Sequence, residues 1–434
     1  MNTEKIYNTL PSPSNYIFLL FWIPFLLYMS YLIADDYLIE VLSAISKKYE
    51  INSDMAGILL LNIGNGIPDL ITSVVALKVD PYIALCISLG SFVFLMTVVL
   101  GGVVMFCRRN EKICYRTFYK NVFFTFIAFV FILYIIAMQK IDIKVCIGML
   151  VSYIVFLLYS FYNSRYASDV IEEINVPQVN LQRKKIKYLF DRFSRPFKFF
   201  LDIILLNTLP KPNYTPIIPK YILGFLSPMI NFFLLLILMN LKMNLARFIS
   251  IMALSCLSGL ILGFLINKSP ENTIFPLYTF LFSCIWIFVV SNELISVINV
   301  MDQTLGINKN IAALTLIAWA NCIGDLVTGI VSSNNGMYRT AVNATMAAPV
   351  HNVLFNLGLI FTVLLARSEE RELDFYIYKD ISLVGLSFIP ITLLIQIFNY
   401  EARNKKLCIE FSFVLFFVYV WFLSLTFIDA VTNF

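Results

Sequence analysis

The sequence contains an internal repeat whose two copies each place an aspartate inside a long apolar stretch. The first copy runs from Asn62 to Asp69 and the second from Ala318 to Asp325, and the two align without a gap. A charged side chain at the centre of a membrane helix costs roughly 3 kcal/mol on insertion scales, so residues of this kind are usually functional. A membrane-embedded carboxylate in each copy therefore predicts two related membrane units that contribute to one site.

The composition indicates a chain that is mostly surrounded by lipid. Hydrophobic residues make up 59% of the 434 residues and charged residues only 14%, with a mean hydropathy of +0.81. The net charge of +5 needs no nucleic-acid partner, because lysine and arginine fall in the short connections between apolar runs. The eight cysteines are scattered and form no CxxC pair, so neither a disulfide framework nor a zinc site is expected, and no cofactor is implied.

Apolar windows of about 20 residues mark the predicted membrane spans. Twelve such windows lie near 15–34, 56–78, 82–106, 121–139, 142–162, 219–239, 246–266, 274–299, 310–333, 340–366, 379–399 and 407–430. They predict an all-α integral membrane protein with helices grouped as five, two and five. The second motif begins seven crossings after the first, so the two five-helix units must face opposite ways. This is the inverted repeat that is typical of secondary transporters.

The grouping divides the chain into four parts. They are a first five-helix repeat (1–162), a polar basic loop (163–218), two extra membrane helices (219–266) and a second, inverted five-helix repeat (267–434). Lysine and arginine concentrate on the side of the large loop, which predicts that the loop is cytosolic.

Two further segments bear on location and regulation. The segment 183–198 is basic with interleaved aromatic residues. It is either a solvated positive-inside anchor or a regulatory segment for an anionic lipid or a protein partner. Residues 1–14 contain no arginine, so no mitochondrial-type presequence is evident, and a plasma or an intracellular membrane both stay open.

An asparagine precedes each aspartate by four residues, as Asn65 before Asp69 and Asn321 before Asp325. Four residues are about one helical turn, so each pair shares a face of its helix. Carboxylates and amides are hard oxygen ligands, and Ca²⁺ takes about 6–8 such ligands in a flexible shell. Nitrogen and sulfur ligands are sparse, which disfavours transition metals. The two motifs together predict a site for Ca²⁺ or another hard cation.

The first motif also contains a helix breaker. Pro68 lacks a backbone donor and clashes with the carbonyl of Gly64, which frees carbonyls from Asn62 onward. Freed carbonyls inside a bilayer need a partner, and a cation supplies one. Gly324 replaces Pro68 in the second copy, so a softer break is expected there.

The spans that follow each motif carry further small polar groups. Ser88 and Ser91 lie in the first of these spans, and Thr345 and Asn352 lie in the second. They are candidate ligands, but serine and threonine are also ordinary at tight contacts between membrane helices. The single histidine, His351, can in principle relay protons. A packed and hydrogen-bonded side chain is the expected role.

Several motifs in this order resemble a known family. Gly64 to Asp69 reads G-N-G-I-P-D, Trp319 to Val327 reads W-A-N-C-I-G-D-L-V, and Ala348 to Asn352 reads A-P-V-H-N. Together they resemble the cation/calcium exchanger superfamily, in the branch that contains the sodium/calcium/lithium exchangers and the plant cation/calcium exchangers. The resemblance covers about 30–107 and 285–366.

The resemblance implies ten core helices in inverted repeats that bind cations between the two motifs. Carried over position by position, it implies a ligand set of Asp69, Asp325, Asn65, Asn321, the hydroxyls of Ser88 and Thr345, the backbone oxygens of Asn62 and Ala318, and the nearby Asn352. Three departures bear on ion preference. Cys322 stands where the family has serine, Phe92 where the wider superfamily has asparagine or a small residue, and Ala347-Ala348 where it has two glycines. Sulfur is a poor ligand for Na⁺ or Ca²⁺.

These observations predict a secondary-active antiporter rather than an enzyme. It would exchange Ca²⁺ for Na⁺ or another monovalent cation by alternating access. One alternative is an intramembrane aspartyl protease, which also needs two membrane aspartates, although the sequence has no P-A-L partner motif. The other is a cation channel or a transport-dead regulator on the same fold.

Overall fold

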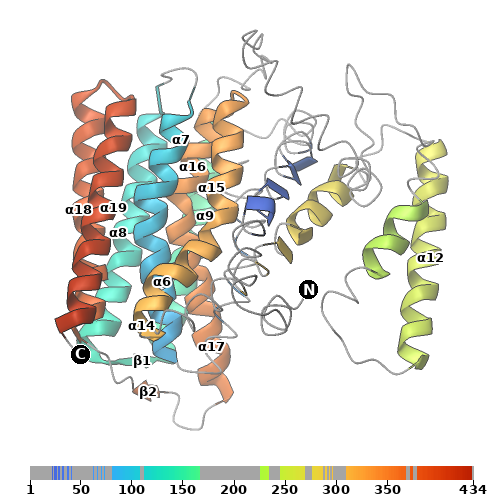
Figure 1. Ribbon diagram of the computed structural model, residues 1–434, viewed down its shortest axis with the longest axis horizontal. Helices are drawn as coiled ribbons and strands as arrows, with labels where there is room; N and C mark the ends of the chain where they lie inside the picture. The colour runs from blue at the N-terminus through green and yellow to red at the C-terminus, as the bar shows by residue number, and fades with distance from the viewer. Residues whose placement is uncertain are drawn as a thin grey trace. The chain divides into compact units, whose positions relative to one another are not determined.

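The computed structural model describes residues 81–107, 112–166, 225–233, 245–268, 276–286, 309–367, 372–374 and 379–432, together with scattered residues between 22 and 73 and between 289 and 296 (Figure 1). Among these residues, seven helices are long and apolar enough to cross a membrane, and the predicted all-helical membrane fold is confirmed. Most of the predicted spans 15–34 and 56–78 and all of the segment 183–198 lie outside the described residues. The chain separates into a larger unit (2–31, 50–175 and 290–434) and a smaller unit (32–49 and 176–289), each described here by itself.

The larger unit contains two series of helices that follow the two sequence repeats. The described part of the first series is α6 (Pro81–Phe94), the π-helical segment η3 (Leu95–Val99), α7 (Leu100–Met105), α8 (Tyr115–Met138) and α9 (Ile143–Tyr166). The second series is α14 (Lys309–Ala312), η4 (Ala313–Ile317), α15 (Ala318–Asn334), α16 (Tyr338–Val350), η5 (His351–Leu357), α17 (Gly358–Arg367), α18 (Lys379–Ala402) and α19 (Ile409–Thr432). Two short strands are β1 (Lys140–Asp142) and β2 (Glu372–Asp374). The predicted bounds of these spans agree to within a few residues, except at the start of α8.

Helix α8 begins more than one turn before the predicted start at residue 121, because its first turns are too polar for an apolar window. The structure gives these polar side chains partners. The hydroxyl of Tyr119 donates to Oε1 of Glu401 at 2.6 Å, and Nζ of Lys120 lies 5.4 Å from the ring centroid of Phe156. Tyrosine and lysine pack their apolar stems while their polar tips find a partner, so the helix extends beyond the apolar run.

The pairing of β1 with β2 shows that the two series of helices have opposite orientations. β1 follows α8, whereas β2 precedes α18, which is the counterpart of α8 in the second repeat. The two strands nevertheless pair antiparallel, with Ile141 opposite Leu373, at one end of the helix bundle (Figure 1). The end of α8 and the start of α18 therefore lie together, so these two helices run in opposite directions. The inverted repeat predicted from the number of crossings is confirmed.

The other ends of the same helices carry the mirror-image contact. The connection before α8 meets the connection after α18, where the backbone N–H of Ile113 donates to the carbonyl of Lys405 at 3.0 Å. The hydroxyl of Tyr400 donates to the carbonyl of Ile113, also at 3.0 Å, and its ring stacks on Phe118 with 3.8 Å between centroids. The two repeats are thus joined at both ends by equivalent pairs of connections.

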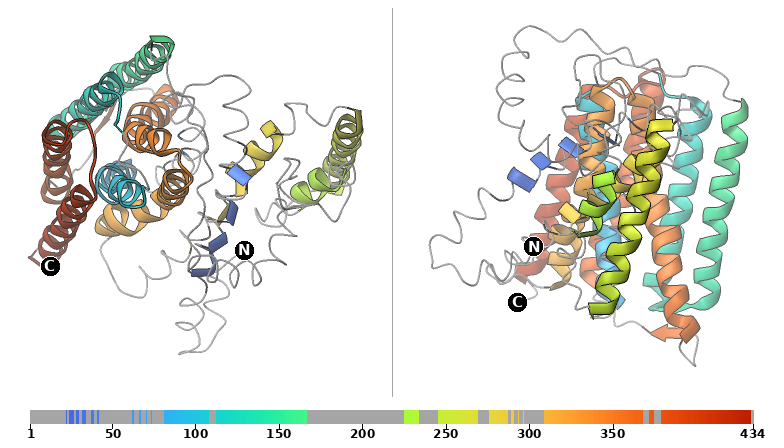
Figure 2. Two further views of the ribbon diagram at one scale, coloured as in Figure 1. Left: turned by 90° about the horizontal axis from the view of Figure 1, so that it is seen from above. Right: turned by 90° about the vertical axis from the view of Figure 1, so that its right-hand side faces the viewer.

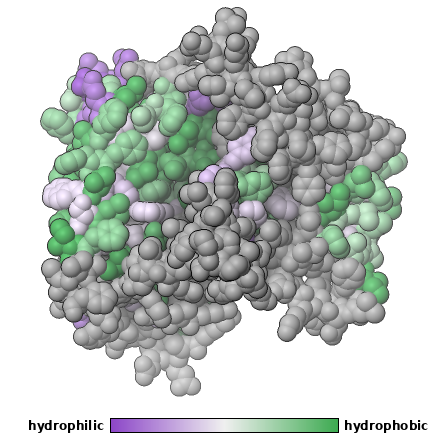
Figure 3. All heavy atoms as spheres, viewed as in Figure 1, coloured by the Kyte–Doolittle hydropathy of each residue, from purple (hydrophilic) through white to green (hydrophobic). Residues whose placement is uncertain are grey.

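The span formed by α6, η3 and α7 lies at the centre of the larger unit. Figure 2 shows it with α15 to α17 on one side and with α8, α9, α18 and α19 along the other. In its most apolar stretch 89% of the residues are buried, whereas in the corresponding stretch of α9 only 28% are buried. Large apolar side chains such as Leu158 on α9 and Phe417 on α19 are exposed, and hydrophobic residues predominate on the visible helices of this unit (Figure 3). The outer helices therefore present an apolar surface, and the central span is enclosed by protein.

Gly90 allows α6 and η4 to pack backbone against backbone. A Cβ atom at Gly90 would lie 1.9 Å from the carbonyl oxygen of Leu314 and 2.8 Å from Cβ of Ala318. Packed carbon atoms normally stay about 3.5–4.0 Å apart, so only glycine fits this contact. Because Ala318 opens the second motif, the contact fixes α6 of the first repeat against that motif.

π-helical turns occur at equivalent places in the two repeats. η3 follows the 14 residues of α6, and η5 follows the 13 residues of its counterpart α16. A third π segment, η4, comes directly before the second motif, whose residues lie in the uninterrupted helix α15. The irregularity in the second copy therefore precedes the motif and does not occur at Gly324. π turns remove carbonyls from the regular hydrogen-bond ladder and are frequent at functional sites.

The smaller unit contains α12 (Leu245–Lys268), a helix at 225–233 and a helix at Pro276–Trp286. Asn231 links the last two, because its Nδ2 donates to the hydroxyl of Tyr278 at 3.0 Å and its Oδ1 accepts from the indole N–H of Trp286 at 2.8 Å. Gly259 of α12 packs against the helix at 225–233, since a Cβ atom at Gly259 would be 2.5 Å from the carbonyl oxygen of Phe225. The predicted two-helix insertion thus packs on the helix with which the second predicted repeat begins.

Candidate cation site

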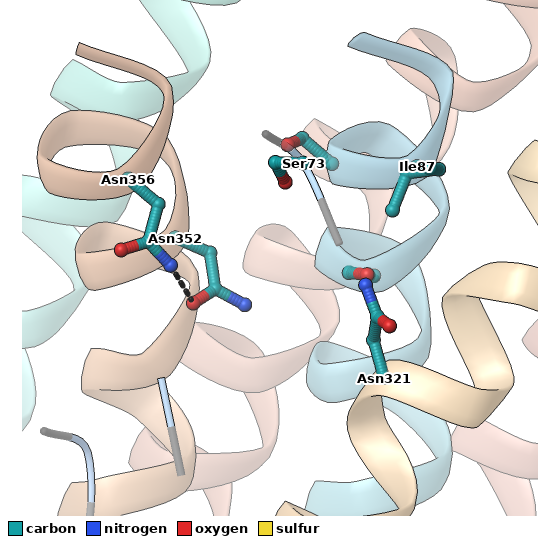
Figure 4. Close-up of a pocket in the computed structure, with 7 residues that line it drawn as sticks. Ser73, Ile87, Asn321, Asn352 and Asn356 are labelled. Carbon is teal, nitrogen blue, oxygen red and sulfur yellow. Dashed lines mark hydrogen bonds between the residues drawn. The ribbon is translucent and has the colours of Figure 1, made fainter. Parts of the chain in front are cut away.

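A polar pocket lies inside the larger unit where α6, α15 and η5 meet (Figure 4). Its empty volume is about 190 Å³, and it is lined by Ser73, Ile87, Ser88, Ser91, Asn321, Asn352 and Asn356. Every one of these residues except Ile87 is polar. The first four belong to the first repeat and the three asparagines to the second, so both repeats contribute to the pocket.

One wall of the pocket is formed by α6 and α15. Ser88 and Ser91 come from successive turns of α6, Asn321 comes from α15, and all three are buried. Oγ of Ser91 has no hydrogen-bond partner among the residues that the structure describes. A buried hydroxyl without a partner costs roughly 1–3 kcal/mol, so a ligand that reached this oxygen would recover part of that cost.

The facing wall is formed by the π segment η5. Nδ2 of Asn356 donates to Oδ1 of Asn352 at 3.3 Å and to the carbonyl oxygen of Gly66 at 3.4 Å. Figure 4 shows these two amides together on one side of the pocket, with Asn321 on the other. Gly66 belongs to the first motif, so this pair of amides ties the second repeat to the motif of the first.

Four predicted site residues therefore meet in the pocket: Ser88, Ser91, Asn321 and Asn352. Three other predicted residues are buried but do not line the pocket. Sγ of Cys322 donates to the carbonyl of Ser91 at 3.8 Å, Ala318 packs against Gly90, and the hydroxyl of Thr345 donates to the carbonyl of Ala341 at 2.9 Å. Their roles as ligands stay predictions.

Of the remaining motif residues, the structure describes only some. Asp325 is half-buried on α15, one turn beyond Asn321, so the two share a helix face. Asn62 is buried. Asn65 and Asp69 lie outside the described residues, and their predicted roles stay predictions.

Two polar residues of the pocket were not predicted from the sequence, Ser73 and Asn356. Both follow a predicted site residue by four positions, Ser73 after Asp69 and Asn356 after Asn352. Residues four apart lie on one face of a helix. Extending each predicted residue by one turn along its helix would therefore have found both.

His351 has the expected packed and hydrogen-bonded role, and it also touches the first motif. It is buried, and its Nδ1 lies 2.7 Å from the hydroxyl of Tyr153 on α9. A Cβ atom at position 66 would be 2.4 Å from Nε2 of His351, so the imidazole lies directly against Gly66. The packed role is confirmed, and it explains why position 66 has no side chain.

The oxygen atoms around the pocket are suitable ligands for a hard cation. Serine hydroxyls and asparagine amides supply neutral oxygen atoms, and Asp325 supplies a carboxylate one turn away on the same helix. Ca²⁺ and similar ions prefer oxygen ligands of this kind. A polar site shared by two inverted repeats, near the middle of membrane-length helices, is the arrangement found in secondary transporters. Fold and pocket together define this class of protein.

Comparisons with known proteins agree with this class. The sequence profile described as sodium/calcium exchanger protein matches residues 19–162 and 275–428, so the chain belongs to the sodium/calcium exchanger protein family. It is similar to the mitochondrial sodium/calcium exchanger protein of Caenorhabditis elegans, with 34% identity over 32% of this chain and 22% of that protein. It is also similar to cation/calcium exchanger 2 of Arabidopsis thaliana, with 25% identity over 79% of this chain and 70% of that protein.

A solved structure of the sodium-calcium exchanger NCX_Mj, soaked with Na⁺ and Sr²⁺, has a similar fold. Its TM-score is 0.54 with 12% identity, over 95% of this chain and 97% of that one. At this identity the likeness concerns the fold alone.

Membership of the family confirms the resemblance inferred from the motifs. The chain is a multi-pass membrane protein of the exchanger class and a transporter, not an enzyme. The alternative of an intramembrane aspartyl protease is thereby set aside.

Proposed function

We propose that this protein is a cation antiporter that exchanges Ca²⁺ for Na⁺ or another monovalent cation across its membrane. The polar pocket would hold the transported ion between the two repeats. Asp69 and Asp325 would supply the negative charge, and Asn65, Ser88, Ser91, Asn321 and Asn352 would supply neutral oxygen ligands.

One observation carries the proposal, namely that both inverted repeats line the same pocket. In transporters built this way, rocking or gating of one part against the other exposes a central site to each side of the membrane in turn. Such alternating access is what an exchanger requires.

The lining of the pocket supports a small cation, because six of its seven residues carry an oxygen atom in the side chain. Two carboxylates, several amides and hydroxyls, and retained water would together reach the roughly 6–8 oxygen atoms that Ca²⁺ takes.

Coupling would follow from competition for the two carboxylates. A single Ca²⁺ neutralises both, and monovalent ions neutralise them singly, so the two kinds of cargo exclude each other. If only an occupied site can change the side it faces, the loss of one ion requires the entry of the other. Exchange then needs no further energy source than the two gradients.

Calcium uptake into proteoliposomes under an outward Na⁺ gradient tests this proposal, with K⁺, Li⁺ and proton gradients in parallel. We expect Ca²⁺ uptake that depends on one of these gradients and is lost in Asp325→Asn. Asp142→Asn is the matched control, because Asp142 lies in β1 at one end of the bundle and makes the same change of charge outside the pocket.

The outcomes separate the alternatives. Ca²⁺ uptake that runs against the Ca²⁺ gradient and is driven by another cation excludes a channel. Flux that only follows the Ca²⁺ gradient would overturn antiport and indicate a channel. No flux from folded protein under any gradient would indicate a transport-dead regulator.

A further inference from the structure

Two buried tyrosines on the outer helices α9 and α19 occupy equivalent positions in the two repeats. Tyr153 is the eleventh residue of the 24-residue helix α9, and Tyr419 is the eleventh residue of the 24-residue helix α19. Each ring packs on a phenylalanine three residues later, with 6.1 Å between the centroids of Tyr153 and Phe156 and 5.7 Å between those of Tyr419 and Phe422. The two helices therefore match in register, and the tyrosines are counterparts.

The surroundings of the two tyrosines match as well. α9 packs on η5 and α17, and α19 packs on their counterparts η3 and α7. Tyr153 meets His351 edge-on with 5.4 Å between ring centroids, and Tyr419 meets Phe94 edge-on at the same 5.4 Å. Phe94 comes directly before η3, and His351 begins η5, so both rings stand where a π segment starts. Each tyrosine is thus packed on the other repeat at an equivalent point.

The hydroxyl of Tyr153 is bonded to the segment that carries Asn352. It lies 2.7 Å from Nδ1 of His351, and His351 directly precedes Asn352 in η5. The imidazole also lies against Gly66 of the first motif, where a Cβ atom would be 2.4 Å from Nε2. The hydrogen bond and this contact together fix the imidazole, and with it the start of the π segment that brings Asn352 to the pocket.

The hydroxyl of Tyr419 is bonded to the segment that carries Asn321. It accepts from the indole N–H of Trp319, which lies two residues before Asn321 in α15. The ring of Phe94, which takes the place of the histidine here, has no hydrogen-bonding group, and the hydroxyl bonds to the second motif directly. Asn321 and Asn352 lie on different sides of the pocket (Figure 4), so the two tyrosines support the pocket from both repeats.

Both hydrogen bonds lie at an end of a π segment. His351 is the first residue of η5, and Trp319 is the second residue after η4. A π turn interrupts the regular hydrogen-bond ladder of a helix. The helix alone therefore constrains the rotation of neighbouring residues less tightly, and a bond to a separate helix supplies the missing constraint.

We infer that Tyr153 and Tyr419 are positioning residues for the transported cation. Tyr153 acts through His351 on Asn352, and Tyr419 acts through Trp319 on Asn321. Neither tyrosine lines the pocket, so each acts on the ion through the asparagine that it helps to hold. This inference rests on the proposed function, because it takes the cation of the exchanger to bind in this pocket.

The test removes each hydroxyl and keeps the ring, with Tyr153→Phe and Tyr419→Phe. We expect each variant to raise the dissociation constant for Ca²⁺ about three- to tenfold, the factor that one hydrogen bond is worth. Calorimetric titration of the purified full chain with Ca²⁺ measures this constant. In proteoliposomes the KM for Ca²⁺ should rise by the same factor at a nearly unchanged maximal rate, because the change affects how the ion is held.

Tyr400→Phe is the matched control. Tyr400 is also buried, and its hydroxyl donates to the carbonyl of Ile113 at 3.0 Å at one end of the bundle. This variant loses a comparable hydrogen bond outside the pocket. It should melt at a lower temperature and bind Ca²⁺ with unchanged affinity.

Two double-mutant cycles test whether each tyrosine acts through its partner. His351→Phe and Trp319→Phe remove the partner nitrogen and keep an aromatic ring. In the His351→Phe background, Tyr153→Phe should have no further effect on the dissociation constant. The same holds for Tyr419→Phe in the Trp319→Phe background.

Each result has one reading. Weaker Ca²⁺ binding that is absent from Tyr400→Phe and disappears when the partner is replaced supports the inference. An unchanged affinity overturns the role of the tyrosine concerned, as does a shift that persists without the partner, an equal shift in Tyr400→Phe, or a lower maximal rate at unchanged KM. If one tyrosine variant does not fold, the cycle at the other still decides. Absence of Ca²⁺ binding by the unmodified chain would overturn the proposed function instead, so the two failures are distinguishable.

Discussion

Replacing Gly90 by alanine tests whether the two repeats meet backbone to backbone next to the pocket. The added Cβ would lie 1.9 Å from the carbonyl oxygen of Leu314, and an ordinary contact begins at 3.4 Å. The backbones of α6 and η4 would therefore have to separate by about 1.5 Å. Ser91 follows Gly90 directly, so the separation would also move Ser91 away from Asn321 within the wall that α6 and α15 form.

The expected cost follows from two opposing terms. Overpacking a tight contact costs about 3 kcal/mol at the upper end of its usual range. Alanine gains about 1 kcal/mol over glycine in a helix interior. The net loss of stability is then about 2 kcal/mol. A displacement of more than 1 Å at a binding site also costs function, so Ca²⁺ uptake should fall by more than the loss of folded protein explains.

The assay is the melting temperature of the purified protein, with Ca²⁺ uptake normalised to the folded fraction. Gly148→Ala is the matched control, because a Cβ atom there would meet its nearest neighbour, the ring of Phe131, at an ordinary 3.5 Å. This control should melt at the same or a higher temperature and transport normally. If Gly90→Ala also behaves in this way, the close contact between α6 and η4 does not exist and the reasoning fails.

Two further substitutions address the buried hydrogen bonds that hold each unit together. Gln396→Leu removes the amide that donates to the carbonyl of Met96 in η3 at 3.2 Å, and a loss of about 1–3 kcal/mol should lower the melting temperature. An unchanged melting temperature would mean that the π turn needs no such support. Asn231→Leu leaves the indole N–H of Trp286 without its acceptor and removes one partner of the Tyr278 hydroxyl, which keeps Ser227, so we expect a lower melting temperature and a shifted tryptophan emission. Unshifted emission would contradict the bond to Trp286.

Most of the fold could be predicted from the sequence because hydropathy and motif order act over long segments. The apolar windows gave the bounds of α6 to α9 and of α14 to α19 to within a few residues, apart from the polar first turns of α8. The inverted orientation followed from the number of crossings between the motifs, and the pairing of β1 with β2 confirms it. The total of twelve helices stays a prediction.

Only part of the pocket lining could be predicted from the sequence. Ser88, Ser91, Asn321 and Asn352 were found because small polar residues stand out in apolar spans. The π segments were not predicted, because one extra residue in a turn hardly alters a hydropathy pattern. Pro349 in α16, just before η5, was the available local signal, since proline removes a helical donor. Without η5, the closeness of Asn356 to Gly66 could not be inferred.

The shared lining of the pocket has a consequence for how such a protein could have arisen. Ser88 and Ser91 on one half of the chain line the same pocket as Asn321 and Asn352 on the other, so neither half contains the complete lining. A shorter ancestor with a single repeat could have built this site only as a pair of copies inserted in opposite directions. Fusing the two copies fixes one orientation for each and lets their side chains diverge, as Pro68 and Gly324 have at equivalent positions. The chain is in this sense an asymmetric dimer made covalent.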